Sequence, residues 1–176
     1  MRTSLRTIMM VAAFIALAAP RSYAQTSALK GEVQKDWAGM KDTMMKIADK
    51  MPEDKFGYKS TPAQRNYGEQ ILHVATANVG FLRALNGKAT PPNINAKATA
   101  KAEILKALSD SFDYGNALLG EQTPESMLQT VKAPFIGDST RGRIFYFLLG
   151  HTWDIYGQMA VYLRLNGLVP PASERP

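Results

Sequence analysis

Apolar residues recur every three or four positions in four separate segments of the chain, and this period constrains the fold more than any other feature. The last segment shows it most clearly, with members spaced 4, 3, 4, 3 and 4 residues apart: Ile144, Leu148, His151, Ile155, Gln158 and Tyr162. Because an α-helix turns once in about 3.6 residues, these side chains share one face of a helix. No segment alternates apolar and polar residues for long enough to require a β-sheet.

Three further segments have the same period, and a proline or a glycine follows each of the four. The expected helices cover about residues 29–51, 67–85 and 98–119, and a long last stretch that ends at 166. Asp138 or Ser139 offers an N-cap for the last helix. Four amphipathic helices in about 150 residues predict an all-α fold, the four-helix bundle.

The first 24 residues have the pattern of a secretory signal peptide. Two arginines precede an apolar run from Ile8 to Ala19, and Ala24 ends a short segment of small and polar residues. We expect cleavage before Gln25 and an exported domain over residues 25–176, located in the periplasm or secreted. The apolar run is shorter than the ~18 residues that span a bilayer, so we expect no stable membrane anchor after cleavage.

Charge and cysteine content narrow the possible functions. Removing the three arginines of the signal from the 21 basic residues leaves 18 against 15 acidic ones, a net charge of +3. With this modest charge and no basic helix face, we expect no nucleic-acid partner. The chain has no cysteine, which excludes disulfides, thiolate metal ligands and covalently attached c-type haem.

Two polar residues, His151 and Gln158, lie within the apolar seam of the last helix. A buried polar group without a partner is costly, so a side chain, a water molecule or a metal has to satisfy each of them. Asp154 lies on the flank of the same seam, and Tyr156 and Gln158 are candidates to line a pocket near His151.

The second helix carries the other histidine within a stripe of small residues. Its members recur at intervals of 4, 3 and 4: His73, Ala77, Gly80 and Ala84. Gly150 and Gly157 lie seven residues apart on one face of the last helix. We expect the two small faces to pack tightly together, with His73 pointing into a partly enclosed gap.

The two histidines are open to two interpretations. They are either core histidines that tyrosine, glutamine or backbone groups satisfy, or ligands of a metal within the bundle. Two imidazoles are fewer than the three protein ligands that catalytic zinc usually has.

The chain after the predicted signal also resembles a known family. His73, near the start of the second helix, and the stretch from His151 to Ser173 are similar to the DinB-like (damage-inducible) family, which includes YfiT-like proteins and thiol S-transferases. The Gly157–Gln158 pair and the ending Tyr-Leu-Arg-Leu-Asn-Gly-Leu-Val-Pro-Pro are its most specific parts. The resemblance covers nearly the whole chain after the signal. It implies an up-down-down-up four-helix bundle and suggests a homodimer.

The resemblance also implies a divalent metal, zinc or nickel. One histidine of the second helix and two of the last helix, four residues apart, would hold it. His73 and His151 match the first two positions, whereas the third is Ile155, which has no atom that can coordinate. Asp154 is adjacent, but its side chain leaves the helix about 100° away from that of residue 155. Asp154 is therefore only an auxiliary ligand or a partner that orients a histidine.

The sequence is compatible with three functions. In the first, the metal site is degenerate and the protein binds an unidentified small molecule or partner. In the second, a metal-dependent enzyme, similar to a thiol S-transferase or a hydrolase, uses His73, His151 and Asp154. In the third, the bundle holds a b-type haem through a histidine and one of four methionines, Met40, Met44, Met45 and Met159.

Overall fold

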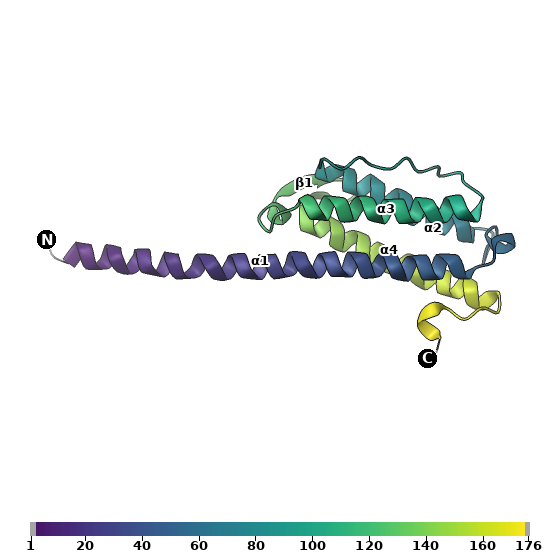
Figure 1. Ribbon diagram of the computed structural model, residues 1–176, viewed down its shortest axis with the longest axis horizontal. Helices are drawn as coiled ribbons and strands as arrows, with labels where there is room; N and C mark the ends of the chain where they lie inside the picture. The colour runs from purple at the N-terminus through teal and green to yellow at the C-terminus, as the bar shows by residue number, and fades with distance from the viewer. Residues whose placement is uncertain (1–2, 175–176) are drawn as a thin grey trace.

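The computed structural model describes residues 3–174, with side chains from residue 27 onward, and it is almost entirely helical (Figure 1). The long helices are α1 (Thr3–Lys50), α2 (Tyr67–Leu82), α3 (Lys101–Glu121) and α4 (Arg141–Leu165). Short 3-10 turns cover Glu53–Lys55, Arg83–Leu85, Ser126–Leu128 and Pro171–Ser173. Strands β1 (Thr130–Ala133) and β2 (Gly137–Thr140) form a small antiparallel hairpin between α3 and α4. The predicted helical bundle is confirmed.

Helices α2 and α3 run parallel to each other. Gly68 lies against Ile104 near their N-terminal ends, and Asn78 donates a hydrogen bond to Ser111 further along both helices. Two parallel neighbours need a connection as long as the helices themselves, and residues 86–100 supply it along one side of the bundle (Figure 1).

Helices α1 and α4 each run antiparallel to one member of this pair. Lys101, at the start of α3, donates a hydrogen bond to the carbonyl of Asp49, near the end of α1. Tyr162, near the end of α4, donates one to the carbonyl of Arg65, just before α2 begins. The order along the chain is therefore up-down-down-up, and the core lies along the common axis.

The predicted apolar faces point into this core. On α1 the buried members are Val33, Trp37, Met40, Met44, Ile47 and Met51, and on α4 they are Ile144, Leu148, Ile155 and Tyr162. The two polar members of the α4 seam, His151 and Gln158, are only half-buried. They lie at the edge of the core, where α4 meets α2.

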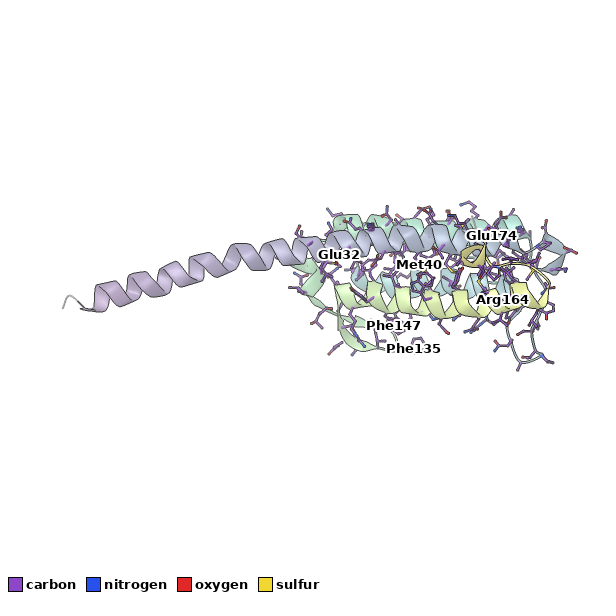
Figure 2. The ribbon with its side chains drawn as sticks, turned by 90° about the horizontal axis from the view of Figure 1, so that it is seen from below. Glu32, Met40, Phe135, Phe147, Arg164 and Glu174 are labelled. Carbon is purple, nitrogen blue, oxygen red and sulfur yellow. The ribbon has the colours of Figure 1, made fainter. Side chains whose placement is uncertain are left out.

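Helix α1 extends beyond the bundle at its N-terminal end (Figures 1 and 2). The helix expected over residues 29–51 is thus continuous with the segment before it. Residues 1–24, for which we predict an export signal, lie outside the residues whose side chains are described, and the signal stays a prediction. No helix in the described part of the chain is long and apolar enough to cross a membrane.

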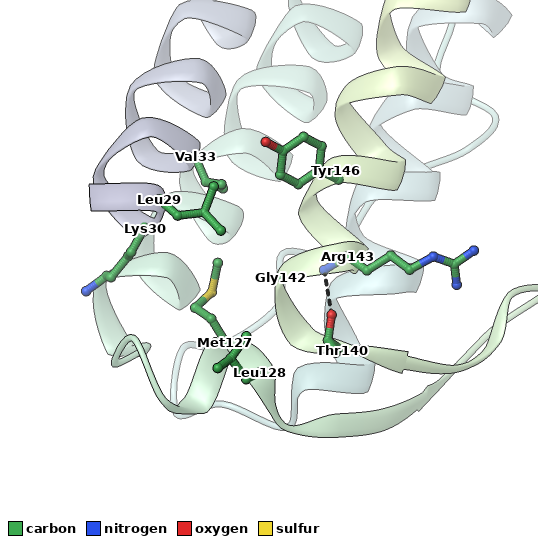
Figure 3. A pocket seen from close by; sticks show the side chains of 9 residues that line it. All are labelled: Leu29, Lys30, Val33, Met127, Leu128, Thr140, Gly142, Arg143 and Tyr146. Carbon is green, nitrogen blue, oxygen red and sulfur yellow. Dashed lines mark hydrogen bonds between the residues drawn. The ribbon is translucent and has the colours of Figure 1, made fainter. Parts of the chain in front are cut away.

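The start of α4 differs from the expectation. Residues 137–140 pair with residues 130–133, so Asp138 and Ser139 belong to a strand and neither caps the helix. The N-cap is Thr140, whose hydroxyl oxygen accepts a hydrogen bond from the backbone N–H of Arg143 at 3.2 Å (Figure 3). Each strand has only four residues, which is too short for its alternation to stand out in the sequence.

The expected tight packing between the small faces of α2 and α4 is wrong. A Cβ atom added to Gly80, Gly150 or Gly157 would meet nothing within 4 Å. Gly150 instead lines a hollow together with residues of α1, so the glycine face of α4 does not point at α2. Helices α2 and α4 meet through histidine, glutamine and phenylalanine pairs. A close approach occurs instead between α1 and α3, where a Cβ on Gly115 would lie 2.3 Å from the Trp37 ring.

Candidate functional site

His73 of α2 and His151 of α4 lie next to each other across the interface between these helices. Their ring centroids are 4.9 Å apart, and the ring planes meet at 87°. The start of α2 is set by a reciprocal capping box, in which Asn66 and Glu69 each bond to the other's backbone N–H. The antiparallel course of α4 then brings the second histidine to the first.

One nitrogen of the His151 ring has no hydrogen-bond partner. Its Nε2 atom is buried, and no donor or acceptor of the described residues reaches it. A buried polar atom of this kind has lost its hydrogen bond to water and gained none from the protein, which costs about 1–3 kcal/mol. A bound molecule that forms a hydrogen bond with Nε2 would recover this free energy.

Both imidazoles favour the neutral form. Burial lowers the pKa of His73, and the positive charge of Arg65 and the neighbouring His151 ring lower it further. Burial also lowers the pKa of His151, where Asp154 partly opposes the shift and Arg65 adds to it. At neutral pH the site therefore presents uncharged nitrogen atoms.

We predict that the protein loses stability as the pH falls below about 6.5, the ordinary pKa of histidine. The pKa values of His73 and His151 are lower in the folded state than in the unfolded state. As the pH falls, these two histidines therefore become protonated in the unfolded chain before they do so in the folded protein. The free energy of unfolding therefore decreases as the pH falls from about 7 to 5. Urea denaturation at several pH values measures this, and the His73→Gln/His151→Gln double variant should show a flatter dependence. An equally steep dependence in that variant would assign the effect to other groups.

A pocket of about 360 Å³ opens beside the two histidines. Helix α2, the first half of α4 and the tip of the hairpin form its wall: His73, Thr76, Ala77, Gly80, Phe81, Pro134, Phe135, Phe147 and His151. Apart from Thr76 and the imidazoles, these side chains are apolar. The volume lies within the range of small-molecule sites, near its lower end, and a mostly apolar wall with few polar groups is typical of them.

Three phenylalanine rings form one side of this pocket. The centroids of Phe81 and Phe147 are 4.8 Å apart with their planes at 38°, and Phe135 lies 6.2 Å from Phe81 at 31°. Phe81 is buried, Phe147 is half-buried and Phe135 is exposed. Figure 2 shows Phe135 and Phe147 at the same edge of the bundle. These rings offer faces on which another aromatic ring can stack.

The other residues predicted from the α4 seam lie outside the pocket wall. Gln158 accepts a hydrogen bond from Gln70 at 2.8 Å and donates one to Asp154 at 3.2 Å, and Asp154 itself is exposed. The Tyr156 hydroxyl is buried and has no hydrogen-bond partner among the described residues. It lies close enough to Tyr67 to add to the increase in pKa that burial causes in Tyr67.

The residues present do not fit the three-histidine metal site that the resemblance implies. Ile155, at the third position, is 2% exposed and packs in the core. Within the described residues, no three histidine, aspartate or glutamate side chains are grouped so that they could hold a metal ion. The methionines considered for haem lie in or against the hydrophobic core: Met40, Met44, Met45 and Met159. The two neutral imidazoles beside an apolar pocket offer nitrogen atoms for hydrogen bonding to a ligand, and the described residues supply no complete set of metal ligands around them.

Sequence reasoning missed the aromatic wall of the pocket. Phe147 lies one turn before His151 on α4, and Phe81 lies about two turns after His73 on α2, so helical spacing could have placed both near the histidines. Phe135 carries no such signal, because it comes from a turn whose position depends on the fold.

A second hollow, of about 250 Å³, lies between α1, the start of α4 and the segment before the hairpin (Figure 3). Leu29, Val33, Met127 and Tyr146 give it a largely apolar lining. None of the candidate metal or pocket residues predicted from the sequence contributes to it, and none of its described lining residues has a buried, unpaired polar atom. The pocket beside the histidines is therefore the stronger candidate for a binding site.

The fold and the site define a class: an up-down-down-up four-helix bundle with two histidines at the contact between its second and fourth helices. A family model described as the DinB superfamily matches residues 37–159. The chain belongs to the DinB superfamily, as its resemblance to this family predicts.

Two solved structures have the same fold. A DinB-like protein from Bacillus cereus matches with a TM-score of 0.71 and 18% identity, and the match covers 79% of this chain and 93% of that one. The DinB-like protein YjoA from Bacillus subtilis matches with a TM-score of 0.62 and 15% identity, covering 82% and 99%. At these identities the likeness concerns the fold alone. The comparison with curated proteins finds no match.

Proposed function

We propose that the protein binds a small, uncharged aromatic molecule in the pocket beside His73 and His151, with a hydroxyl group of that molecule on His151. The observation that carries the proposal is the buried, unpaired Nε2 atom of His151, a residue that lines an apolar pocket. The apolar wall favours an apolar ligand by about 25 cal/mol for each Å² removed from water. A hydrogen bond to this nitrogen would fix the ligand's orientation.

The chemistry of the two imidazoles supports a hydroxyl group over an anion. Burial lowers the pKa of both His73 and His151, so neither provides a positive charge at neutral pH. A hydroxyl both donates and accepts, so it can pair with Nε2 whichever ring nitrogen carries the proton. A carboxylate or phosphate only accepts hydrogen bonds. Its charged group would also lose its hydration on contact with the three phenylalanine rings, which costs free energy.

Titration calorimetry with 4-ethylphenol and ethylbenzene at pH 7.5 tests this proposal. The two compounds share the ring and the ethyl group, and only the first has a hydroxyl. We expect 4-ethylphenol to bind with a Kd of about 0.1 mM, an ordinary affinity for nine heavy atoms. Ethylbenzene should bind about fivefold to tenfold more weakly, because one hydrogen bond contributes about 1 kcal/mol.

Two variants assign the preference to one atom. His151→Phe keeps an aromatic ring but removes Nε2, so both compounds should then bind with similar affinity. His73→Phe, the matched control, leaves that nitrogen in place and should keep the preference for the phenol. The proposal is wrong if the wild-type protein binds neither compound at millimolar concentration, or if the preference survives in His151→Phe.

A further inference from the structure

Phe135 is exposed to an unusual degree for a residue that lines a pocket. Its side chain is 98% exposed, although its ring lies 6.2 Å from the ring of Phe81 at the pocket wall. A free phenylalanine ring in water makes no favourable contribution to folding, because apolar area contributes only when it is buried.

The backbone at Phe135 is also unfavourable for this residue type. Its φ angle is +60°, in the left-handed region that a side chain other than glycine rarely adopts. Its neighbours close a three-residue turn around it, in which the N–H of Ile136 donates to the carbonyl of Pro134 at 2.6 Å. Strained positions of this kind persist where the surrounding structure holds them, and they cluster at binding sites.

The base of the hairpin is firmly placed, so the turn has a defined position over the pocket. Four residue pairs join β1 and β2, and Ala133 and Ser139 on the two strands are buried. The N–H of Arg141 also donates to the carbonyl of Gln129, which ties the hairpin to the start of α4. The strands thus form a fixed base for the hairpin, and its tip holds the ring of Phe135 at the edge of the pocket beside the histidines.

We propose that Phe135 is a ligand-contacting residue, which covers the outer face of an aromatic ring bound against Phe81 and Phe147. This inference rests on the function proposed above and goes one step further. It assigns the mouth of the pocket to the hairpin tip and restricts the ligand to a flat ring. Contact with such a ring buries the exposed face of Phe135, which no described side chain of the protein covers.

Two substitutions separate the role of the ring from the strain in the backbone. Phe135→Ala removes the ring but keeps a Cβ atom at positive φ, whereas Phe135→Gly removes the ring and relieves the strain. Both should weaken binding of 4-ethylphenol about tenfold, because an aromatic contact and its buried area are lost. Only Phe135→Gly should raise Tm, by about 2 °C, while Phe135→Ala should leave it within about 1 °C.

Further variants control for unrelated effects. Phe135→Tyr keeps the aromatic face and should retain most of the affinity for 4-ethylphenol that Phe135→Ala and Phe135→Gly lose. Leu128→Ala removes another exposed apolar side chain, one that lines the separate hollow between α1 and α4, and should also leave binding unchanged.

The outcomes distinguish this inference from the function on which it rests. If the wild-type protein binds 4-ethylphenol and both Phe135→Ala and Phe135→Gly bind it equally well, the role of Phe135 is overturned and the proposed function stands. If the wild-type protein binds neither test compound, the proposed function and the role of Phe135 are both overturned. If either variant loses its helical circular dichroism, the ring holds the fold together, and a ligand-contacting role is overturned as well.

Discussion

Replacing Trp37 by alanine should lower the free energy of unfolding by about 3–5 kcal/mol. The indole is 1% exposed and packs against Phe112 and Phe145, with ring centroids 5.1 Å and 5.5 Å away. Its Nε1 donates a hydrogen bond to the carbonyl of Phe112 at 2.9 Å. The substitution leaves a cavity where α1, α3 and α4 meet, and it also leaves a buried carbonyl without its partner. Since domains are stable by only about 5–15 kcal/mol, this loss is a large share of the total.

The second tryptophan provides the matched control. Trp153 is 53% exposed, and its ring contacts Tyr156 on the same helix. Trp153→Ala should therefore cost no more than about 0.5 kcal/mol. Urea denaturation followed by circular dichroism compares the two variants, each of which keeps one indole. A Trp37→Ala loss below about 1.5 kcal/mol would contradict the packing described for the three helices.

Replacing Ile155 by histidine should raise the affinity for Zn²⁺ by more than about 100-fold. The new imidazole would lie one helical turn after His151 on the same face, and with His73 it would complete three ligands, the usual number at a catalytic zinc. Removing a group that only orients a ligand already changes metal affinity by about 10–100-fold, so adding a direct ligand should exceed this. Calorimetric titration of Zn²⁺ at pH 7.5 into the wild-type protein and the variant measures the gain.

Two companion variants show whether the three positions share one site. Ile155→Asn replaces the same buried side chain by a polar one that is a poor zinc ligand, and it controls for disturbance of the core. Ile155→His/His151→Ala should lose the gain, because only two imidazoles remain. A gain that persists without His151, or no gain in the single variant, would separate His73 and His151 from any common metal position.

The helical architecture could be predicted from the sequence because its signals are local. The seam on α4 and the stripe on α1 place buried residues three and four positions apart, and any helix with that spacing must bury the same face. The periodicity of apolar residues does not indicate the direction in which each helix runs in the bundle. That direction came from the resemblance to the DinB-like family, and contacts such as Asn78 with Ser111 confirm it.

The errors arose where a pattern was local but its partner was not. Gly80, Gly150 and Gly157 formed small faces on their own helices, but the rotation of each helix about its axis sets which faces meet. Gly150 lies beside α1 and not beside α2. The hairpin was missed because four residues per strand give too few alternations. Its formation also moved the N-cap of α4 to Thr140.

For the candidate site, the sequence alone determined that His151 lies on the core-facing seam of its helix, that it has no histidine one turn further on, and that the fold is helical. The tertiary structure decided the rest. It placed the His73 ring 4.9 Å from His151, left Nε2 of His151 buried without a partner, and brought Phe135 from a distant turn to the pocket. The physical reason is that periodicity fixes the direction of a side chain about its own helix axis, whereas a pocket depends on how separate segments are positioned against one another.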